Sequence, residues 1–185
     1  PTAIIVSSIA WLASRAGVPG APFALSTYNL SSPWSMVGWS GFIGLICFLF
    51  SALMITPGES GTGLMDIAEA KTEILEGMTV EFSGVNLALV NLSITVRSLA
   101  FSALIVSLFF PGSLFAGSLP RAAGYVVDFF WFWLKVLAVA LVGVTYLRSV
   151  FGRLKIWQAA RFYWGYVGLL SLAGMILITV EIMLR

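Results

Sequence analysis

Apolar residues along this chain fall into long runs that are separated by short polar connections. A helix needs about 20 mostly apolar residues to cross the roughly 30 Å hydrocarbon core of a membrane. Four runs reach that length: Trp34–Ile55, Leu87–Phe110, Phe129–Leu147 and Phe162–Val180. The opening run, Ala3–Leu12, is too short to cross alone and is expected to be the end of a truncated span. The pattern predicts an all-α, polytopic transmembrane helix bundle with four complete spans and a partial one.

The composition supports this interpretation. Hydrophobic residues make up 59% of the 185 residues and charged residues only 10%, whereas a soluble domain carries about 25% charged residues. No Gly/Ser-rich linker and no repeat of fixed period divides the chain, which begins with Pro instead of Met. We therefore expect residues 1–185 to form a single multi-pass domain in the cell membrane, the C-terminal part of a longer subunit.

Charged residues gather in two of the connections. The connection 148–161 is basic, and the positive-inside rule places it in the cytoplasm; its cations are Arg148, Arg153, Lys155 and Arg161. The connection 58–85 is acidic and lies between the second and third helices, counting the partial span as the first. Because two spans separate the two connections, we expect both to be cytoplasmic loops.

The acidic loop holds most of the carboxylates of the chain. Six of the eight acids lie in or next to it: Glu59, Asp66, Glu69, Glu73, Glu76 and Glu81. Four of these, from Asp66 to Glu76, are spaced i, i+3, i+7 and i+10, so a helix would carry them on one face. Two interpretations stay open at this point. The face is either the solvated side of a loop helix or a row of carboxyls that exchange protons.

Two cations lie inside the predicted spans. Arg97 and Lys135 are near the middle of their runs. A charge at mid-membrane costs about 2.5–3.5 kcal/mol on insertion scales, so such residues usually face the bundle interior and pair with an acid. Carboxylates of the acidic loop are the expected partners, Glu59 first among them; snorkelling of the cations to an interface is the alternative. Glu181, near the outer end of the last helix, is expected to be a surface acid.

Several classes of chemistry are excluded within this chain. It contains no histidine and one cysteine, Cys47, inside a predicted span. An iron–sulfur cluster needs about four thiolate or imidazole ligands, and structural zinc sites and Ser-His-Asp triads need residues that are missing here. The basic residues form no nucleic-acid-binding face, and "GESGTG" matches no phosphate-binding loop. We predict no catalytic residue, metal site or cofactor in this chain, so any redox centre belongs to a partner.

Two motifs resemble a known family. The first is "MDIAEAKTEILEGMTVEFSG" and the second is "FWFWLKVLAVALVGVTYLRSVFGRLKIWQAARFYW". Together they resemble the long cytoplasmic loop and the last two helices of subunit 1 of respiratory complex I. The resemblance covers residues from about 40 to 185, which correspond to the C-terminal part of that subunit, from its fourth helix onward.

The resemblance implies a role for the charged residues. In this family the subunit anchors the membrane arm to the electron-transfer arm, and its loop glutamates line a polar path towards antiporter-like subunits. On that basis a proton or ion pathway would include Glu59, Asp66, Glu69, Glu73, Glu81, Arg97 and Lys135. An interface with the peripheral arm would include Arg148, Arg153, Lys155 and Arg161. Glu76 is not part of the family motif.

The first motif departs from the quinone-linked form of the family. Thr62 replaces the loop arginine, Leu64 and Ala68 replace prolines, and Lys71 replaces a glutamate. In the next helix Ile94 replaces an acid, and Arg97 stands where hydrogenase-type relatives have a basic residue. The chain is therefore most similar to the membrane anchor subunit of membrane-bound [NiFe] hydrogenases or sulfur reductases, which take electrons from ferredoxin.

That similarity implies partners and cofactors outside this chain. The expected partners are hydrogenase-like large and small subunits, a ferredoxin-type iron–sulfur subunit and antiporter-like membrane subunits, besides the lipid bilayer. A NiFe or related centre and iron–sulfur clusters are expected in those partners. We expect this chain to couple electron transfer to H⁺ or Na⁺ translocation through the row of loop carboxylates.

Other functions stay open from sequence. One is the quinone-site subunit of a complex I that oxidises NADH or a reduced deazaflavin. Another is a stand-alone ion transporter, although the inverted repeats that are typical of transporters are not visible. A third is a structural anchor, in which the acids serve only as a docking surface for a basic partner.

Overall fold

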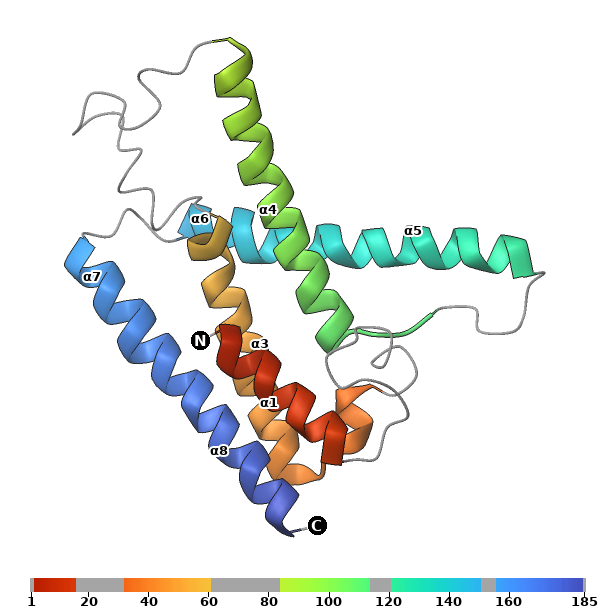
Figure 1. Ribbon diagram of the computed structural model, residues 1–185, viewed down its shortest axis with the longest axis vertical. Helices are drawn as coiled ribbons and strands as arrows, with labels where there is room; N and C mark the ends of the chain where they lie inside the picture. Colours follow the sequence, from red (N-terminus) through yellow and green to blue (C-terminus); the bar gives the residue numbers. More distant parts are fainter. Residues whose placement is uncertain (1, 16–31, 61–83, 114–120, 151–155, 185) are drawn as a thin grey trace.

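The computed structural model describes residues 2–15, 32–60, 84–113, 121–150 and 156–184 (Figure 1). Within these ranges every regular element is a helix, which confirms the all-α prediction. The short first helix is α1 (Thr2–Arg15), and it is followed by a 3₁₀ turn, η1 (Pro33–Met36). The longer helices begin with α3 (Trp39–Ser60) and α4 (Val85–Phe109).

Two further rods each contain a π-helical segment. The first runs from α5 (Arg121–Ala140) through η3 (Leu141–Tyr146) into α6 (Leu147–Val150). The second runs from α7 (Ile156–Ala160) through η4 (Arg161–Val167) into α8 (Gly168–Leu184). Four helices of the described ranges are long and apolar enough to cross a membrane: Trp39–Glu59, Val85–Phe109, Gly124–Tyr146 and Trp157–Leu184. The prediction of four complete spans is therefore confirmed.

The boundaries of α3 differ from the prediction at both ends. At its start, Pro33–Met36 form the separate turn η1, and Val37 is extended, so the helix begins at Trp39. The Trp34 indole donates a hydrogen bond to the carbonyl of Phe109 and packs edge-to-face on Phe42 of α3, with ring centroids 5.3 Å apart. At its end, α3 continues to Ser60. Glu59 therefore lies in the last helical turn and not in a loop that starts at residue 58.

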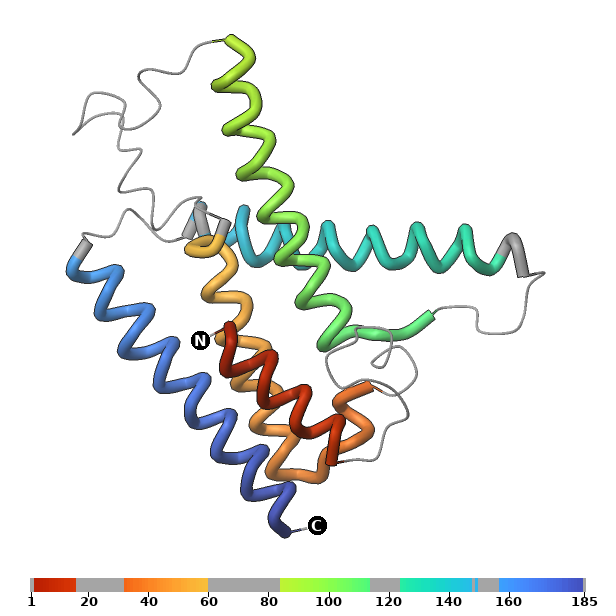
Figure 2. The backbone as a smooth tube through the Cα atoms, in the orientation of Figure 1, coloured from red at the N-terminus to blue at the C-terminus, as the bar shows by residue number. Residues whose placement is uncertain are grey.

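Helix α3 is the centre of the bundle. It contacts α1, α4, α8 and η3, and α8 runs antiparallel to it along most of its length (Figure 2). Gly44 and Gly174 allow the two backbones to approach closely. A Cβ added at Gly174 would lie 2.8 Å from two ring carbons of Phe48 and 3.1 Å from the carbonyl oxygen of Gly44. Small residues permit such close contacts between membrane helices, where dispersion and not the hydrophobic effect drives packing.

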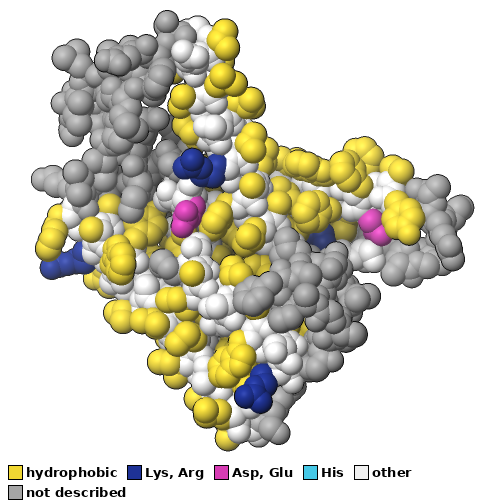
Figure 3. Space-filling model, viewed as in Figure 1, with side chains coloured by type: hydrophobic (Ala, Val, Ile, Leu, Met, Phe, Trp, Pro, Cys, Tyr) yellow, Lys and Arg dark blue, Asp and Glu magenta, His cyan; other side chains and the backbone are white. Residues whose placement is uncertain are grey.

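Two elements extend away from this bundle. The first half of α4 projects beyond α3, and α5 crosses α4 and runs outwards (Figures 1 and 2). Large apolar side chains are exposed along α5, including Tyr125, Phe129, Phe130, Trp133 and Leu137. The visible face of the molecule is largely hydrophobic, with few charged side chains (Figure 3). This surface is typical of contact with lipid or with other membrane chains.

Candidate functional site

A cavity of about 400 Å³ lies at the C-terminal end of α3. Ile4 of α1 forms one side of it, Ile55 and Gly58 of α3 a second side, and Leu169 and Leu172 of α8 a third. Glu59, Tyr163 and Trp164 also line it, and the hydroxyl oxygen of Tyr163 is itself buried. The cavity therefore combines apolar walls with a negative charge and a phenol.

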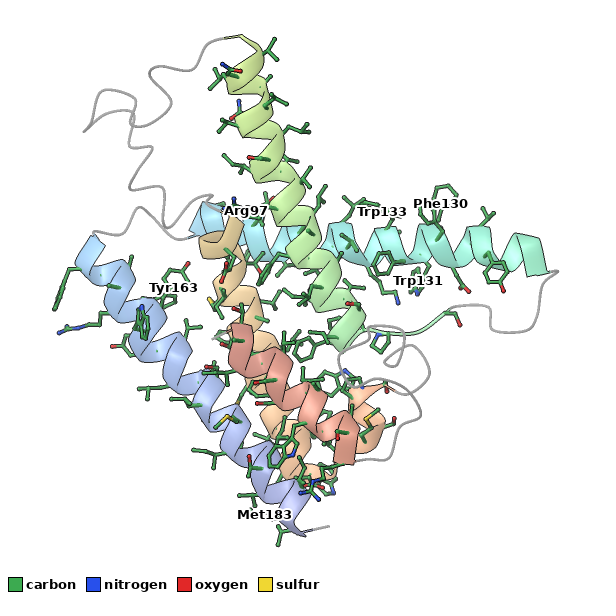
Figure 4. All side chains as sticks on the ribbon, in the orientation of Figure 1. Arg97, Phe130, Trp131, Trp133, Tyr163 and Met183 are labelled. Atoms are coloured by element: carbon green, nitrogen blue, oxygen red, sulfur yellow. The ribbon has the colours of Figure 1, made fainter. Side chains whose placement is uncertain are left out.

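Tyr163 is placed by the π-helical segment η4 and by Gly58. Its side chain projects from the α7–α8 rod towards α3 (Figure 4). A Cβ at Gly58 would lie 3.1 Å from the Cζ atom and 3.2 Å from the hydroxyl oxygen of Tyr163, so a larger residue would displace the ring. The side chain is only 8% exposed. Its hydroxyl oxygen is buried without a hydrogen-bond partner among the described residues.

The other π-helical segment lies against the same end of α3. Gly143 of η3 is buried, and a Cβ there would contact the side chain of Thr56 at 3.4 Å. The Thr56 hydroxyl donates to the carbonyl of Ala52 at 2.9 Å, inside its own helix. Both π-helical segments thus contact the last turns of α3, next to Pro57. Such segments are often found at functional sites because they re-aim side chains.

Most of the predicted acidic row lies outside the described residues. This holds for Asp66, Glu69, Glu73 and Glu81, and also for Glu76. Among the predicted basic interface residues, Arg153 and Lys155 lie outside as well, and the side chain of Arg148 is not described. Arg161 is described and exposed, beside Trp157 and Gly165. Both the ion pathway through the acidic loop and the interface formed by the basic residues therefore stay predictions.

Arg97 does not face the interior of this chain's bundle as expected. Its side chain is exposed on the projecting part of α4 (Figure 4). The physical reason is that the first half of α4 projects beyond α3 (Figure 1), and Thr95 and Val96 beside Arg97 are exposed as well. A partner for the guanidinium therefore has to come from outside the described residues.

Lys135 binds backbone carbonyl oxygens, whereas carboxylates of the acidic loop were the expected partners. Its Nζ atom donates to the carbonyl oxygens of Phe110 at 3.0 Å and Gly112 at 2.8 Å, and lies 5.7 Å from the centre of the Trp131 ring. The last carbonyls of a helix have no intrahelical donor, and a cation is favourable at that end of the helix dipole. Lys135 therefore binds carbonyl oxygens just beyond the C-terminal end of α4. Lys135 and Asp128 both line a second cavity, of about 430 Å³, at this end of α4.

Glu181 is not the surface acid that the sequence suggested. Its carboxylate accepts hydrogen bonds from the backbone N–H groups of Gly38 at 2.9 Å and Gly41 at 3.3 Å, and from the Ser40 hydroxyl. It therefore caps the N-terminal end of α3 from the neighbouring helix α8. The first N–H groups of a helix lack partners, and an anion is favourable there. Two features of the sequence could have predicted this capping. Glu181 is the only acid of its apolar span, and α3 starts without an Asp or Asn that could cap it.

No cluster of three or more His, Cys, Asp or Glu side chains suited to a metal ion occurs in the described ranges. Cys47 is a partly buried free thiol in the middle of α3.

Comparisons with known proteins identify the family. The family model described as NADH dehydrogenase matches residues 1–179. The similarity therefore begins earlier than residue 40, the approximate start of the resemblance found in the sequence. A NADH-quinone oxidoreductase subunit of Dehalococcoides mccartyi is 30% identical over 142 residues, which are 77% of this chain and 36% of that protein. The corresponding NADH-quinone oxidoreductase subunit of Geobacillus kaustophilus is 32% identical over 145 residues, 77% of this chain and 41% of that protein.

An NADH-ubiquinone oxidoreductase occurs among the relatives too. Chain 1 of this oxidoreductase from Heterololigo bleekeri is 27% identical over 123 residues, which cover 60% of this chain and 39% of that protein. The chain thus spans about two fifths of the length of the curated relatives that it matches. The family model covers nearly the whole chain, and four helices of the described residues are able to span a membrane. This multi-pass membrane chain therefore belongs to the NADH dehydrogenase family.

Proposed function

We propose that this chain is a membrane-arm subunit of a complex I-like oxidoreductase, which couples electron transfer in a peripheral arm to translocation of H⁺ or Na⁺. Family membership and the similarity to NADH-quinone oxidoreductase subunits support the assignment to such a complex. The ion path would run through the carboxylates of the acidic loop, with Glu59 at its start. The redox centres would belong to partner subunits, because the chain has no histidine and a single cysteine.

The observation that carries this proposal is the polar surface of α4. Within a span of 25 apolar-rich residues, the side chains of Asn91, Ser93, Thr95 and Arg97 are all exposed. A charge facing lipid at this depth is costly, and polar side chains in membrane spans usually contact another helix. We infer that this half of α4 is covered by protein outside the described residues, as expected for a subunit of an assembly.

Two electron-transfer partners are candidates. The names of the relatives, which are quinone oxidoreductases, favour a quinone-reducing complex I. The departures at Thr62, Leu64, Ala68 and Lys71 favour a ferredoxin-linked complex of the membrane-bound hydrogenase or sulfur reductase type. In that second case the partners would be hydrogenase-like large and small subunits and a ferredoxin-type subunit.

Purification of the intact complex from membranes, followed by mass spectrometry of its subunits, tests the assignment. We expect cluster-bearing peripheral subunits and antiporter-like membrane subunits to co-purify. An NADH-oxidising module would favour quinone reduction, and a [NiFe]-hydrogenase-like large subunit would favour the ferredoxin-linked type. A chain that purifies alone, without cluster-bearing partners, would contradict the proposal.

The role of the loop acids is tested by a matched pair of substitutions. Glu73→Gln removes a carboxylate that matches the family motif, whereas Glu76→Gln removes one on the same predicted face that does not match it. We expect Glu73→Gln to lower ion translocation by at least about tenfold in assembled complexes, in line with the usual effect of removing a proton-transfer group. Glu76→Gln should retain translocation. Full retention in Glu73→Gln complexes would favour the docking-surface interpretation of the acids.

A further inference from the structure

The second cavity, of about 430 Å³, lies where the end of α4 meets α5. Among the described residues, three titratable side chains line it, and all of them belong to α5: Tyr125, Asp128 and Lys135. The stretch of α4 and the following segment that closes the cavity, from Val106 to Ser113, carries no charge. A cavity of this size with several polar groups can hold water, which needs two to four polar partners.

The backbone beyond α4 is shaped to bind the ammonium group of Lys135. The carbonyl oxygens of Phe110 and Gly112 accept hydrogen bonds from its Nζ atom at 3.0 Å and 2.8 Å. Phe110 is the C-terminal cap of α4, and Gly112 has a φ of +145°, a conformation that residues with a side chain rarely adopt. Two carbonyl groups therefore converge on one nitrogen atom, and one of them depends on a glycine.

These two hydrogen bonds leave one N–H group of the ammonium for another partner. A lysine ammonium has three N–H groups, and two of them donate to the carbonyls. Loss of the third proton leaves a neutral amine with two N–H groups, which is enough to keep both hydrogen bonds. Lys135 can therefore release and take up a proton without losing its contacts with the end of α4. The Trp131 ring, whose centre lies 5.7 Å from Nζ, offers no site for that proton.

Asp128 is the group of this cavity that can accept the proton. It lies seven residues before Lys135 in α5, so both side chains are on the same face of the helix, about 10 Å apart along its axis. Both residues are partly buried, and both line the same cavity. The lysine side chain and water in the cavity can bridge the distance between the two groups.

We propose that Asp128 and Lys135 exchange a proton across this cavity and form one stage of the ion path. An N–H bond of the ammonium breaks, water carries the proton, and an O–H bond forms on the Asp128 carboxylate; the reverse step restores the ion pair. Ammonium with carboxylate and amine with carboxylic acid are both neutral overall, so neither state leaves an unpaired charge within a span. The inference rests on the proposed function, and it adds to the path Asp128, which neither sequence motif includes.

Proton transport by the reconstituted complex tests this exchange. The purified complex is placed in liposomes, electron transfer is driven by NADH or by reduced ferredoxin, and proton movement is followed with a pH-sensitive dye. We expect Asp128→Asn to lower proton transport by at least about tenfold, the usual effect of removing a proton-transfer group. Asp128→Glu, which keeps a carboxyl group, should recover most of the transport. Unchanged transport in Asp128→Asn would overturn the proposal.

A double substitution separates proton exchange from an ion pair that only stabilises the fold. Removing one member of a partly buried pair leaves the other charge unpaired, whereas removing both members does not. Lys135→Gln keeps an amide that can donate to the two carbonyls, so Asp128→Asn combined with Lys135→Gln should assemble as wild type does. A purely structural pair would then recover proton transport as well. We expect transport in the double variant to stay at least about tenfold below wild type, and recovered transport would overturn the proposal.

A measurement on the wild-type complex covers the case in which these variants fail to assemble. Dicyclohexylcarbodiimide reacts with protonated carboxyl groups in membrane proteins, and mass spectrometry identifies the labelled residues. Asp128 should be labelled several-fold faster during turnover than at rest, because it then holds a proton part of the time. Glu181, which accepts hydrogen bonds at the start of α3, is the internal control and should be labelled equally in both conditions. Equal labelling of Asp128 in both conditions would contradict the exchange.

The behaviour of the wild-type complex separates this inference from the proposed function. Wild-type complexes that transfer electrons without moving any ion would contradict both. Wild-type complexes that move Na⁺ with no proton movement would agree with the proposed function and overturn the exchange between Asp128 and Lys135.

Discussion

The carboxylates at the two ends of the α3–α8 pair differ in their hydrogen bonding. At the start of α3, Glu181 of α8 accepts hydrogen bonds from Gly38, Ser40 and Gly41. At the other end of the same pair, Glu59 is exposed, and the neighbouring Tyr163 hydroxyl is buried without a partner among the described residues. Glu181 has hydrogen-bond donors within the chain, whereas the described residues offer none to Glu59 or Tyr163.

The helix dipole explains why the difference matters. An anion at the N-terminal end of a helix is stabilising and the same anion at the C-terminal end is destabilising, by about 0.3–1 kcal/mol each at exposed sites. Glu181 therefore stabilises the fold, whereas the helix end that carries Glu59 disfavours its charge. The C-terminal end of α3 therefore carries an exposed charge and a buried phenol that the described residues leave without a hydrogen-bond partner.

Removing the Glu181 carboxylate should have the largest effect on this contrast. Glu181→Ala leaves two backbone N–H groups and the Ser40 hydroxyl without their acceptor, so we expect unfolding to become easier by about 2–3 kcal/mol. In a thermal melt in detergent this corresponds to a fall in Tm of about 2–4 °C per kcal/mol. The matched change at the open end, Glu59→Ala, should cost less than about 0.5 kcal/mol. Equal losses at the two ends would remove the distinction.

The close contact between the two helices should be the next most sensitive feature. Gly174→Ala places a methyl group 2.8 Å from the buried Phe48 ring, so we expect a destabilisation of about 1–2 kcal/mol from overpacking. Gly124→Ala is the control, because a Cβ there meets nothing within 4 Å. In that open position alanine should stabilise the helix by up to about 1 kcal/mol. Thermal melts of the two variants should therefore shift in opposite directions.

The smallest effect is expected at Tyr163, and its sign is informative. Tyr163→Phe removes a buried hydroxyl that makes no hydrogen bond within the described residues, so in lipid-free detergent the change should be neutral or stabilising by up to about 1 kcal/mol. The exposed Tyr166 gives the comparison, since Tyr166→Phe should leave the Tm unchanged. Destabilisation of Tyr163→Phe would mean that the hydroxyl has a partner outside the described residues.

Parts of the fold could be read from the pattern of apolar residues. The four spans were predicted within a few residues, because a run of about 20 apolar residues has few other stable environments. The ends of α3 were not predicted. Its start is capped by Glu181, which is 143 residues away from Gly38 in the chain. Its end includes Pro57, a residue that sequence reasoning takes as a helix breaker.

Only one of the two main residues of the candidate site was predicted from the sequence. Glu59 was singled out because charges are rare in this chain, but Tyr163 was not, because a tyrosine at the end of an apolar span reads as an interfacial aromatic residue. The pairing of Lys135 with carbonyl oxygens of Phe110 and Gly112 was also missed. Backbone acceptors are the same for every residue type, so no sequence pattern marks them.

The sequence by itself determined the class, the spans and the family of this protein. Those properties depend on composition, on runs of apolar residues and on local motifs, all of which are carried along the chain. Only the tertiary structure decided which acid stabilises the fold and which is left open. That outcome depends on which helix end each carboxylate meets, and α8 brings Glu181 to the start of α3 across 143 residues of chain from Gly38. Identical side chains thus acquire opposite roles because the dipole and the free N–H groups lie at only one end of a helix.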